Sequence, residues 1–172
     1  ASDVYKRQIT DEMFQYIKDK AKTSHEDSLY SALSDWYAWS RYSGIRRSEW
    51  CQTRKTIFDV VDTGEAQAFI YEDVSFADER GRPLDPRTDS FDLVESSFVK
   101  WRYQKNKDNG EIIQYFIDKV NTEWDSCRAL WNISRRAKRL GVKAHEPIAK
   151  YKADNGRIIF ITDKDVKDTL QE

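Results

Sequence analysis

The sequence predicts one α+β domain over residues 9–172, mainly helical, with a small antiparallel sheet and a second hairpin. Three observations predict this class. Apolar residues recur at helical spacing in several stretches that polar loops separate. The segments SFVKWRYQ and EIIQYF alternate or concentrate strand-forming residues on either side of a turn that contains Asn109-Gly110. A second pair of strand-like segments, 147–151 and 157–161, surrounds Asp154-Asn155-Gly156.

The composition is that of a folded protein. Six Trp, nine Tyr and eight Phe are many for a chain of 172 residues that is 34% charged, and this length is sufficient for a core. No apolar run approaches the ~20 residues that span a membrane. Cys51 and Cys127 have no partnering pattern, which predicts small buried thiols in a reducing compartment, cytoplasmic or nuclear. Without a Cys or His cluster, we expect no metal site.

Both ends of the sequence predict a fragment. Residues 3–8, DVYKRQ, resemble the in-frame translation of a sequencing-library adaptor, so residues 1–8 are left out of the fold. At the other end, VKDTLQE stops in the middle of a helical pattern.

Two helices are expected before residue 44. Thr10 is a predicted N-cap for a helix over residues 11–22, and the polar loop TSHED then leads to a helix over about 28–43. Leu33, Trp36 and Trp39 lie on one face of that second helix. Gly44 is the residue type that most easily ends a helix in the left-handed conformation. A short helix is expected next, opening with Arg46 and carrying Glu49 one turn later.

Strands follow. QAFIYEDVSF (67–76) is rich in aromatic and β-branched residues and predicts a strand, whereas residues 77–90, with two prolines and several acids, predict an irregular surface loop. In the hairpin, Val99 and Trp101 point to one face while Lys100 and Arg102 point to the other. The partner strand 111–116 is expected to place Ile113 and Tyr115 on the apolar face.

The last helices are predicted from their caps. Thr122 with Asp125 three residues later predicts a helix that runs to about Leu140, with Gly141 beyond it. Thr162 with Asp165 predicts a final helix in the same way. The helix over 122–140 ends in four cations, namely Arg135, Arg136, Lys138 and Arg139. Cations there suit the helix dipole, and a phosphate-facing edge is an equally weighted alternative.

Charge is distributed unevenly along the chain. Residues 55–96 hold four Lys/Arg against eleven Asp/Glu, a net charge of −7, whereas residues 97–150 hold twelve against six, a net charge of +6. A basic half is what local contact with phosphates requires, although an ordinary charged surface explains the count as well. No Gly-rich phosphate loop and no nucleophile elbow is present, so a nucleotide cofactor and a serine hydrolase are not supported.

The order of these parts resembles the catalytic domain of the tyrosine recombinases, the phage-integrase family. YSGIRRSEW (42–50) is similar to that family's first arginine box, with Arg46 at the position of the catalytic arginine and Glu49 at that of its acidic partner. The hairpin WRYQKNKDNGEII is similar to the family's lysine hairpin, with Lys105 as the catalytic lysine and Lys107 as the alternative. The plainer interpretation is an i, i+3 ion pair and a solvated turn.

The resemblance covers roughly residues 28–140 and is incomplete. The family's His-x-x-Arg box and its late nucleophilic tyrosine are absent, so the fragment is expected to be catalytically inactive and to form no covalent DNA adduct. The resemblance implies double-stranded DNA as partner, a possible homo-oligomer on DNA, and neither a metal nor another cofactor. The hairpin around 147–161 matches no part of the family pattern.

DNA contacts are expected from the basic residues of the hairpin and the following helix: Lys100, Arg102, Lys107, Arg135, Arg136 and Arg139. The sequence also allows two other functions. The first is a DNA-binding remnant without catalysis, and the second is an interaction module that docks a partner through the Trp-rich helix 28–43. Exposure of Trp36 and Trp39 would favour the second, and their burial would favour a scaffold role.

Overall fold

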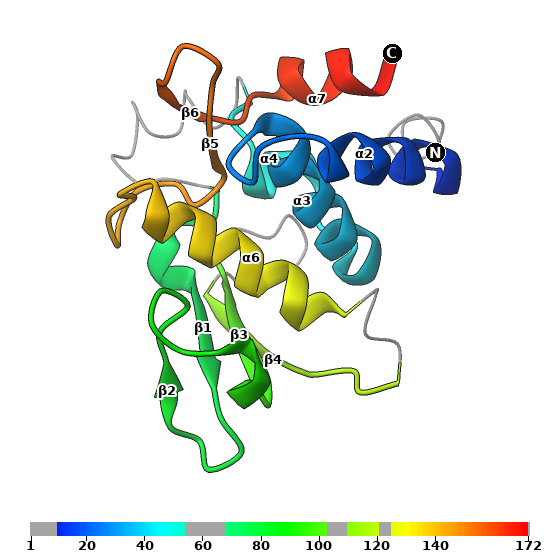
Figure 1. The fold of residues 1–172 in the computed structure, drawn as a ribbon. Coiled ribbons are helices and arrows are strands. Elements are labelled where there is room, and N and C mark those ends of the chain that lie inside the picture. The colour runs from blue at the N-terminus through cyan, green and yellow to red at the C-terminus, as the bar shows by residue number, and fades with distance from the viewer. Residues whose placement is uncertain (1–9, 54–67, 103–109, 121–124, 172) are drawn as a thin grey trace.

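The computed structural model describes residues 10–53, 68–102, 110–120 and 125–171 (Figure 1). Within these ranges it contains five α-helices, a four-stranded antiparallel sheet and a two-stranded hairpin, which confirms the α+β class. The helices α2, α3, α4 and α7 form a group on one side, and α6 lies between this group and the four-stranded sheet (Figure 1). None of the helices in the described ranges is long and apolar enough to cross a membrane.

The first two helices are confirmed with their predicted caps. Helix α2 (Asp11–Lys22) begins after Thr10, whose hydroxyl oxygen accepts a 3.1 Å hydrogen bond from the Met13 backbone N–H. Helix α3 (Leu29–Ser43) begins after Ser28, whose hydroxyl accepts from the backbone of Ser31. The apolar stripes of the two helices face one another, so that both pack into a common core.

The four-stranded sheet has the order β2-β1-β3-β4 and is antiparallel throughout. Its strands are β1 (Val74–Ala77), β2 (Pro83–Leu84), β3 (Ser96–Trp101) and β4 (Glu111–Phe116). The predicted hairpin is present as β3 and β4, with Val99 opposite Ile113. Val99 and Trp101 are buried and Lys100 is exposed, which confirms the alternation read from the sequence.

Two predictions between residues 67 and 90 are wrong. The strand begins only at Val74, because Asp73 folds back and its carboxylate accepts a 2.9 Å hydrogen bond from the Ile70 backbone N–H. Tyr71–Asp73 is therefore a 3-10 turn, η1. The loop after β1 is not wholly irregular, since Pro83 and Leu84 form the short edge strand β2, a position where a missing backbone N–H is tolerated. A second 3-10 turn, η2 (Phe91–Leu93), precedes β3.

Helix α6 (Ser126–Arg139) begins later than predicted. Asp125, and not Thr122, is its N-cap, because the Asp125 carboxylate accepts a 3.0 Å hydrogen bond from the Cys127 backbone N–H. Thr122 itself lies outside the described residues. The helix ends at Arg139, and Gly141 follows with a positive φ of 80°, as predicted from its place in the sequence.

The core is built largely from aromatic rings on both faces of α6. Trp131 contacts Phe76 of the sheet edge-on, with ring centroids 4.9 Å apart, and Trp39 of α3 contacts Tyr115 of β4 at 4.7 Å. Trp36 and Trp39 each expose 2% or less of their surface. This burial favours a scaffold role for α3 over docking of a partner through these two side chains.

The second hairpin and the final helix are confirmed. Strands β5 (Lys150–Lys152) and β6 (Ile158–Phe160) pair in antiparallel fashion, and α7 (Asp163–Gln171) follows. Thr162 and Asp165 form the predicted capping box, each accepting a backbone hydrogen bond from the other at 3.0 and 3.1 Å.

Candidate functional site

The turn between α3 and α4 (Arg47–Trp50) directs Arg46 outward. The backbone of Gly44 is left-handed, with φ 72° and ψ 21°, and its N–H donates to the Ser40 carbonyl oxygen at 2.8 Å. Ile45 then turns inward and is buried, so Arg46, the next residue, faces solvent at the N-cap of α4. The sequence therefore produces this placement through one glycine and one apolar side chain.

The Arg46 guanidinium has no hydrogen-bond or ion-pair partner in the described part of the chain. Its neighbour Arg47 differs, since its Nη1 donates to the Asp163 carboxylate of α7 at 3.2 Å and its side chain is half-buried. Of these two adjacent arginines, one holds the fold together and the other is available to an external anion. A guanidinium in this state can bind a phosphate through two parallel hydrogen bonds.

Glu49 lies one helical turn after Arg46, and its carboxylate is buried. Burial raises the pKa of Glu49 to about 7, although the nearby Arg46 charge and a backbone hydrogen bond from Arg46 favour the ionised form. Its Oε2 atom has no hydrogen-bond partner in the described structure. A buried carboxylate with one unsatisfied oxygen and a strongly perturbed pKa is a recognised sign of a functional position.

An aromatic stack holds α4 in place. The rings of Trp50 and Trp36 lie parallel, with centroids 4.8 Å apart and an interplanar angle of 8°, and Tyr37 meets Trp50 edge-on. Cys51, at the end of α4, is buried, and burial raises the pKa of its thiol to about 12, so it remains a neutral packing residue. The short helix that carries Glu49 is therefore fixed to α3 on its inner side.

The described residues of the hairpin hold one exposed cation and one that is paired with a carboxylate. Lys100 is exposed on β3. Arg102 donates from Nε and Nη2 to the two carboxylate oxygens of Asp73, both at 3.1 Å, and the Asp73 side chain is fully buried. Lys105 and Lys107, the predicted catalytic lysine and its alternative, lie outside the described residues, so the structure does not place either of them relative to Arg46.

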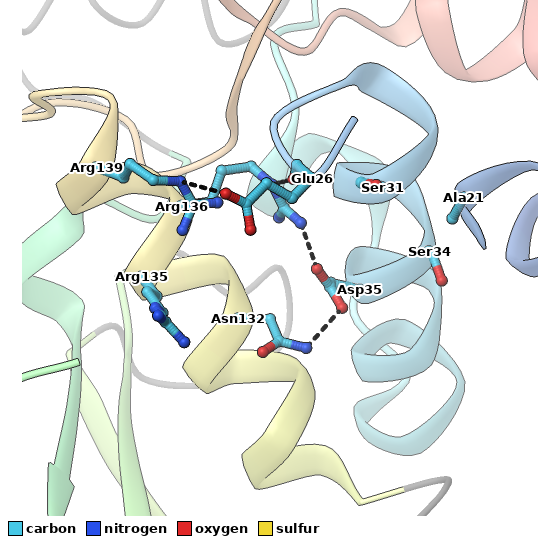
Figure 2. Close-up of a pocket in the computed structure, with 9 residues that line it drawn as sticks. All are labelled: Ala21, Glu26, Ser31, Ser34, Asp35, Asn132, Arg135, Arg136 and Arg139. Atoms are coloured by element: carbon cyan, nitrogen blue, oxygen red, sulfur yellow. Dashed lines mark hydrogen bonds and ion pairs between the residues drawn. The ribbon is translucent and has the colours of Figure 1, made fainter. Parts of the chain in front are cut away.

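The three arginines of α6 predicted to contact DNA fall into two kinds. Arg136 is buried and donates to the Asp35 carboxylate of α3 at 2.6 Å (Figure 2). Arg139 donates to the Asp27 carboxylate at 2.8 and 2.5 Å. Only Arg135 is exposed without such a partner in the described residues. The basic edge of α6 thus serves mainly to attach this helix to α3 and the loop before it.

The carboxylates that pair with these arginines were not anticipated from the sequence. Asp27, Asp35 and Asp73 lie between 29 and 112 positions from the arginines they bind. No spacing pattern connects such residues, and only the fold brings them together. The one available signal is weak, namely that Asp35 interrupts the half-buried face of an aromatic-rich helix. Among the described residues, no group of three or more His, Cys, Asp or Glu side chains is arranged to hold a metal ion.

No family model, no curated protein and no solved structure matches this chain.

Proposed function

We propose that this chain acts on double-stranded DNA as part of a strand-breaking and rejoining protein of the tyrosine recombinase kind, with Arg46 as the contact to the attacked phosphate. The observation that carries this proposal is the Arg46 turn. Its guanidinium is exposed and unpaired in the described structure, while the adjacent Arg47 and the acidic partner Glu49 are held by the fold. The order of parts supports it, since the Arg46 turn, the β3–β4 hairpin and α6 follow one another as in that family.

The chemistry assigns a separate task to each group. An attacked phosphodiester gains negative charge on its non-bridging oxygens, and a preorganised guanidinium stabilises that charge. Glu49 fixes the backbone of Arg46 from the buried side, so that the turn does not have to reorganise during the reaction. Lys105, or Lys107 in its place, donates a proton to the leaving 5′ oxygen. The nucleophilic tyrosine is assigned to a residue outside this sequence, and the proposal requires no metal or other cofactor.

The proposal places the protein where DNA is, in the cytoplasm or the nucleus, and allows a homo-oligomer assembled on DNA. The DNA-binding remnant without catalysis is less favoured than it is from the sequence. Arg102 and Arg139, two of the phosphate contacts expected of such a remnant, already bind carboxylates of Asp73 and Asp27.

The test measures the affinity of the chain for a labelled duplex by fluorescence anisotropy over a range of salt concentrations. Loss of one phosphate contact reduces the slope of log affinity against log salt by about 1. We therefore expect Arg46→Gln to weaken binding by about tenfold and to lower the slope by about 1. The matched control is Arg87→Gln, which removes another exposed arginine, from the acidic loop between β2 and η2, and should leave both quantities unchanged.

Two outcomes contradict the proposal. An Arg46→Gln variant with the affinity and salt slope of the unchanged chain would show that Arg46 touches no phosphate. An unchanged chain with no salt-dependent affinity for duplex DNA would remove the basis of the whole assignment. Circular dichroism of each variant, recorded before the titration, separates a lost contact from a lost fold.

A further inference from the structure

A polar cleft of about 290 Å³ lies between α3 and α6 (Figure 2). One wall carries the hydroxyls of Ser31 and Ser34, and the other carries Asn132 and Arg135. The mouth is bordered by Glu26, from the loop between α2 and α3. This volume is at the lower end of the range for small-molecule sites and is much larger than a single phosphate group.

The charged groups at the floor of the cleft are paired with one another. Asp35 lies between Asn132 and Arg136 and accepts hydrogen bonds from both, at 3.2 and 2.6 Å (Figure 2). Arg136 also donates from Nε to the Glu26 carbonyl oxygen at 3.0 Å. Burial acts to raise the pKa of Asp35, and its side chain is nevertheless fully hydrogen-bonded, so this pair forms a rigid base rather than a free charge.

Arg135 is the unneutralised charge of the cleft. Its guanidinium has no hydrogen-bond or ion-pair partner in the described part of the chain, and no dashed line in Figure 2 joins it to another lining residue. Arg139, on the next turn of α6, is held by Asp27. The Arg135 guanidinium, with the Asn132 amide on the same wall and the hydroxyls of Ser31 and Ser34 on the opposite wall, is a donor-rich arrangement that suits the oxygen atoms of a phosphate.

We propose that this cleft binds a phosphate ester with one sugar-sized group attached, with Arg135 as its principal contact. The source is either a free nucleotide or one nucleotide unit of a nucleic acid strand. The inference does not depend on Arg46, because none of its contacts involves the turn between α3 and α4.

Glu26 is the competing anion. Its side chain is 69% exposed, and its carboxylate stands 3.7 Å from the Arg139 Nε, a weak pair that solvent screens. An incoming phosphate must share the mouth of the cleft with this carboxylate. Removing the charge of Glu26 therefore strengthens phosphate binding, which is a result that a purely structural role for Glu26 does not produce.

The experiment is isothermal titration of the full chain at low salt with three small probes: AMP, adenosine and inorganic phosphate. A fourth arm measures binding to a short duplex by anisotropy. We expect AMP to bind and adenosine not to bind, and Arg135→Gln to weaken AMP or duplex binding by about tenfold or more. Glu26→Gln should strengthen the same binding by about two- to fivefold. Arg87→Gln is again the matched control.

Each outcome decides the matter. Loss of AMP affinity in Arg135→Gln identifies a free nucleotide as a ligand, and loss of duplex affinity alone identifies a nucleotide within a strand. Equal binding of adenosine and AMP overturns the proposal, as does an Arg135→Gln variant that binds both AMP and duplex like the unchanged chain. Binding by no probe to the unchanged chain overturns it too. The Arg46 proposal is tested with a different variant, Arg46→Gln, so its failure would not change the interpretation of the Arg135→Gln result.

Discussion

Replacing Asp73 with alanine tests how the β3–β4 hairpin is held to the rest of the domain. The Asp73 side chain is fully buried and accepts three hydrogen bonds, two from Arg102 at 3.1 Å and one from the Ile70 backbone N–H at 2.9 Å. Alanine removes all three hydrogen bonds at once. It takes the buried carboxylate away from the guanidinium of Arg102 and removes the acceptor of the Ile70 backbone N–H.

The expected loss follows from these contacts. Breaking a buried ion pair by removing one partner costs about 3–5 kcal/mol. Because the Arg102 side chain keeps 24% of its surface exposed, it can recover some hydration, which places the loss near the lower limit, at about 3 kcal/mol. For a domain of this size, that corresponds to a fall in Tm of roughly 6–12 °C. Asp73→Asn keeps an acceptor for Ile70 and should lose only about half as much.

Urea unfolding followed by tryptophan fluorescence measures the change, with the m-value as a check that the unfolded state is unaltered. The control is Arg82→Gln, which removes a side chain that is 68% exposed from its pair with Asp78 and should produce a much smaller change. Asp73→Ala and Arg82→Gln variants of equal stability would refute the conclusion that the Asp73–Arg102 pair anchors the hairpin.

Three further predictions concern the Arg46 turn. Burial raises the pKa of Glu49 from 4.5 to about 7, so the folded state binds the proton of this carboxyl more tightly than the unfolded state does. The free energy of unfolding therefore falls as the pH rises from about 4.5 through about 7. Glu49→Gln should remove this pH dependence, which amounts to roughly 2–3 kcal/mol of unfolding free energy between pH values below 4.5 and above 7. Urea unfolding midpoints measured at pH values on either side of this range test the prediction. Gly44→Ala should cost about 1–2 kcal/mol in thermal unfolding, because nothing lies within 4 Å of the added Cβ and only the left-handed backbone is strained. Trp50→Ala should cost about 3–5 kcal/mol by the same measurement, since it removes the parallel stack on Trp36.

Elements with a local signal were predictable from the sequence. Helices α2 and α3 are fixed by hydroxyl caps and by apolar spacing, and β3 and β4 by alternation on either side of a Gly-containing turn. The prediction failed where a side chain satisfied the backbone in an unexpected way. Asp73 bonds the Ile70 N–H and replaces strand hydrogen bonds with a turn, and Asp125 caps α6 by itself. Both are hydrogen bonds between a side chain and the nearby backbone, which helix and strand propensities do not describe.

The candidate site was predictable only in part. The left-handed Gly44 and the outward Arg46 follow from the order of residues along one turn. The division of the arginines into structural and available ones does not, because it depends on carboxylates about one hundred positions away. Arg135, Arg136 and Arg139 are all cations in the last turns of α6, and the positions of Asp27 and Asp35 identify the two that are paired. The role of Lys105, which lies in residues 103–109 outside the described structure, stays a prediction from the sequence.

The second hairpin, which matched no part of the family pattern, has a physical role at the Arg46 turn. The segment 161–163, at the junction of β6 and α7, is hydrogen-bonded to the chain immediately after α4. The Gln52 N–H donates to the Ile161 carbonyl oxygen at 2.8 Å, the Asp163 N–H donates to the Gln52 carbonyl oxygen at 3.0 Å, and Arg47 pairs with the Asp163 carboxylate. Helix α4 is too short to be stable alone. It is held on one side by the Trp36–Trp50 stack and on the other by this segment, so the direction in which Arg46 points is set by residues more than one hundred positions later in the chain.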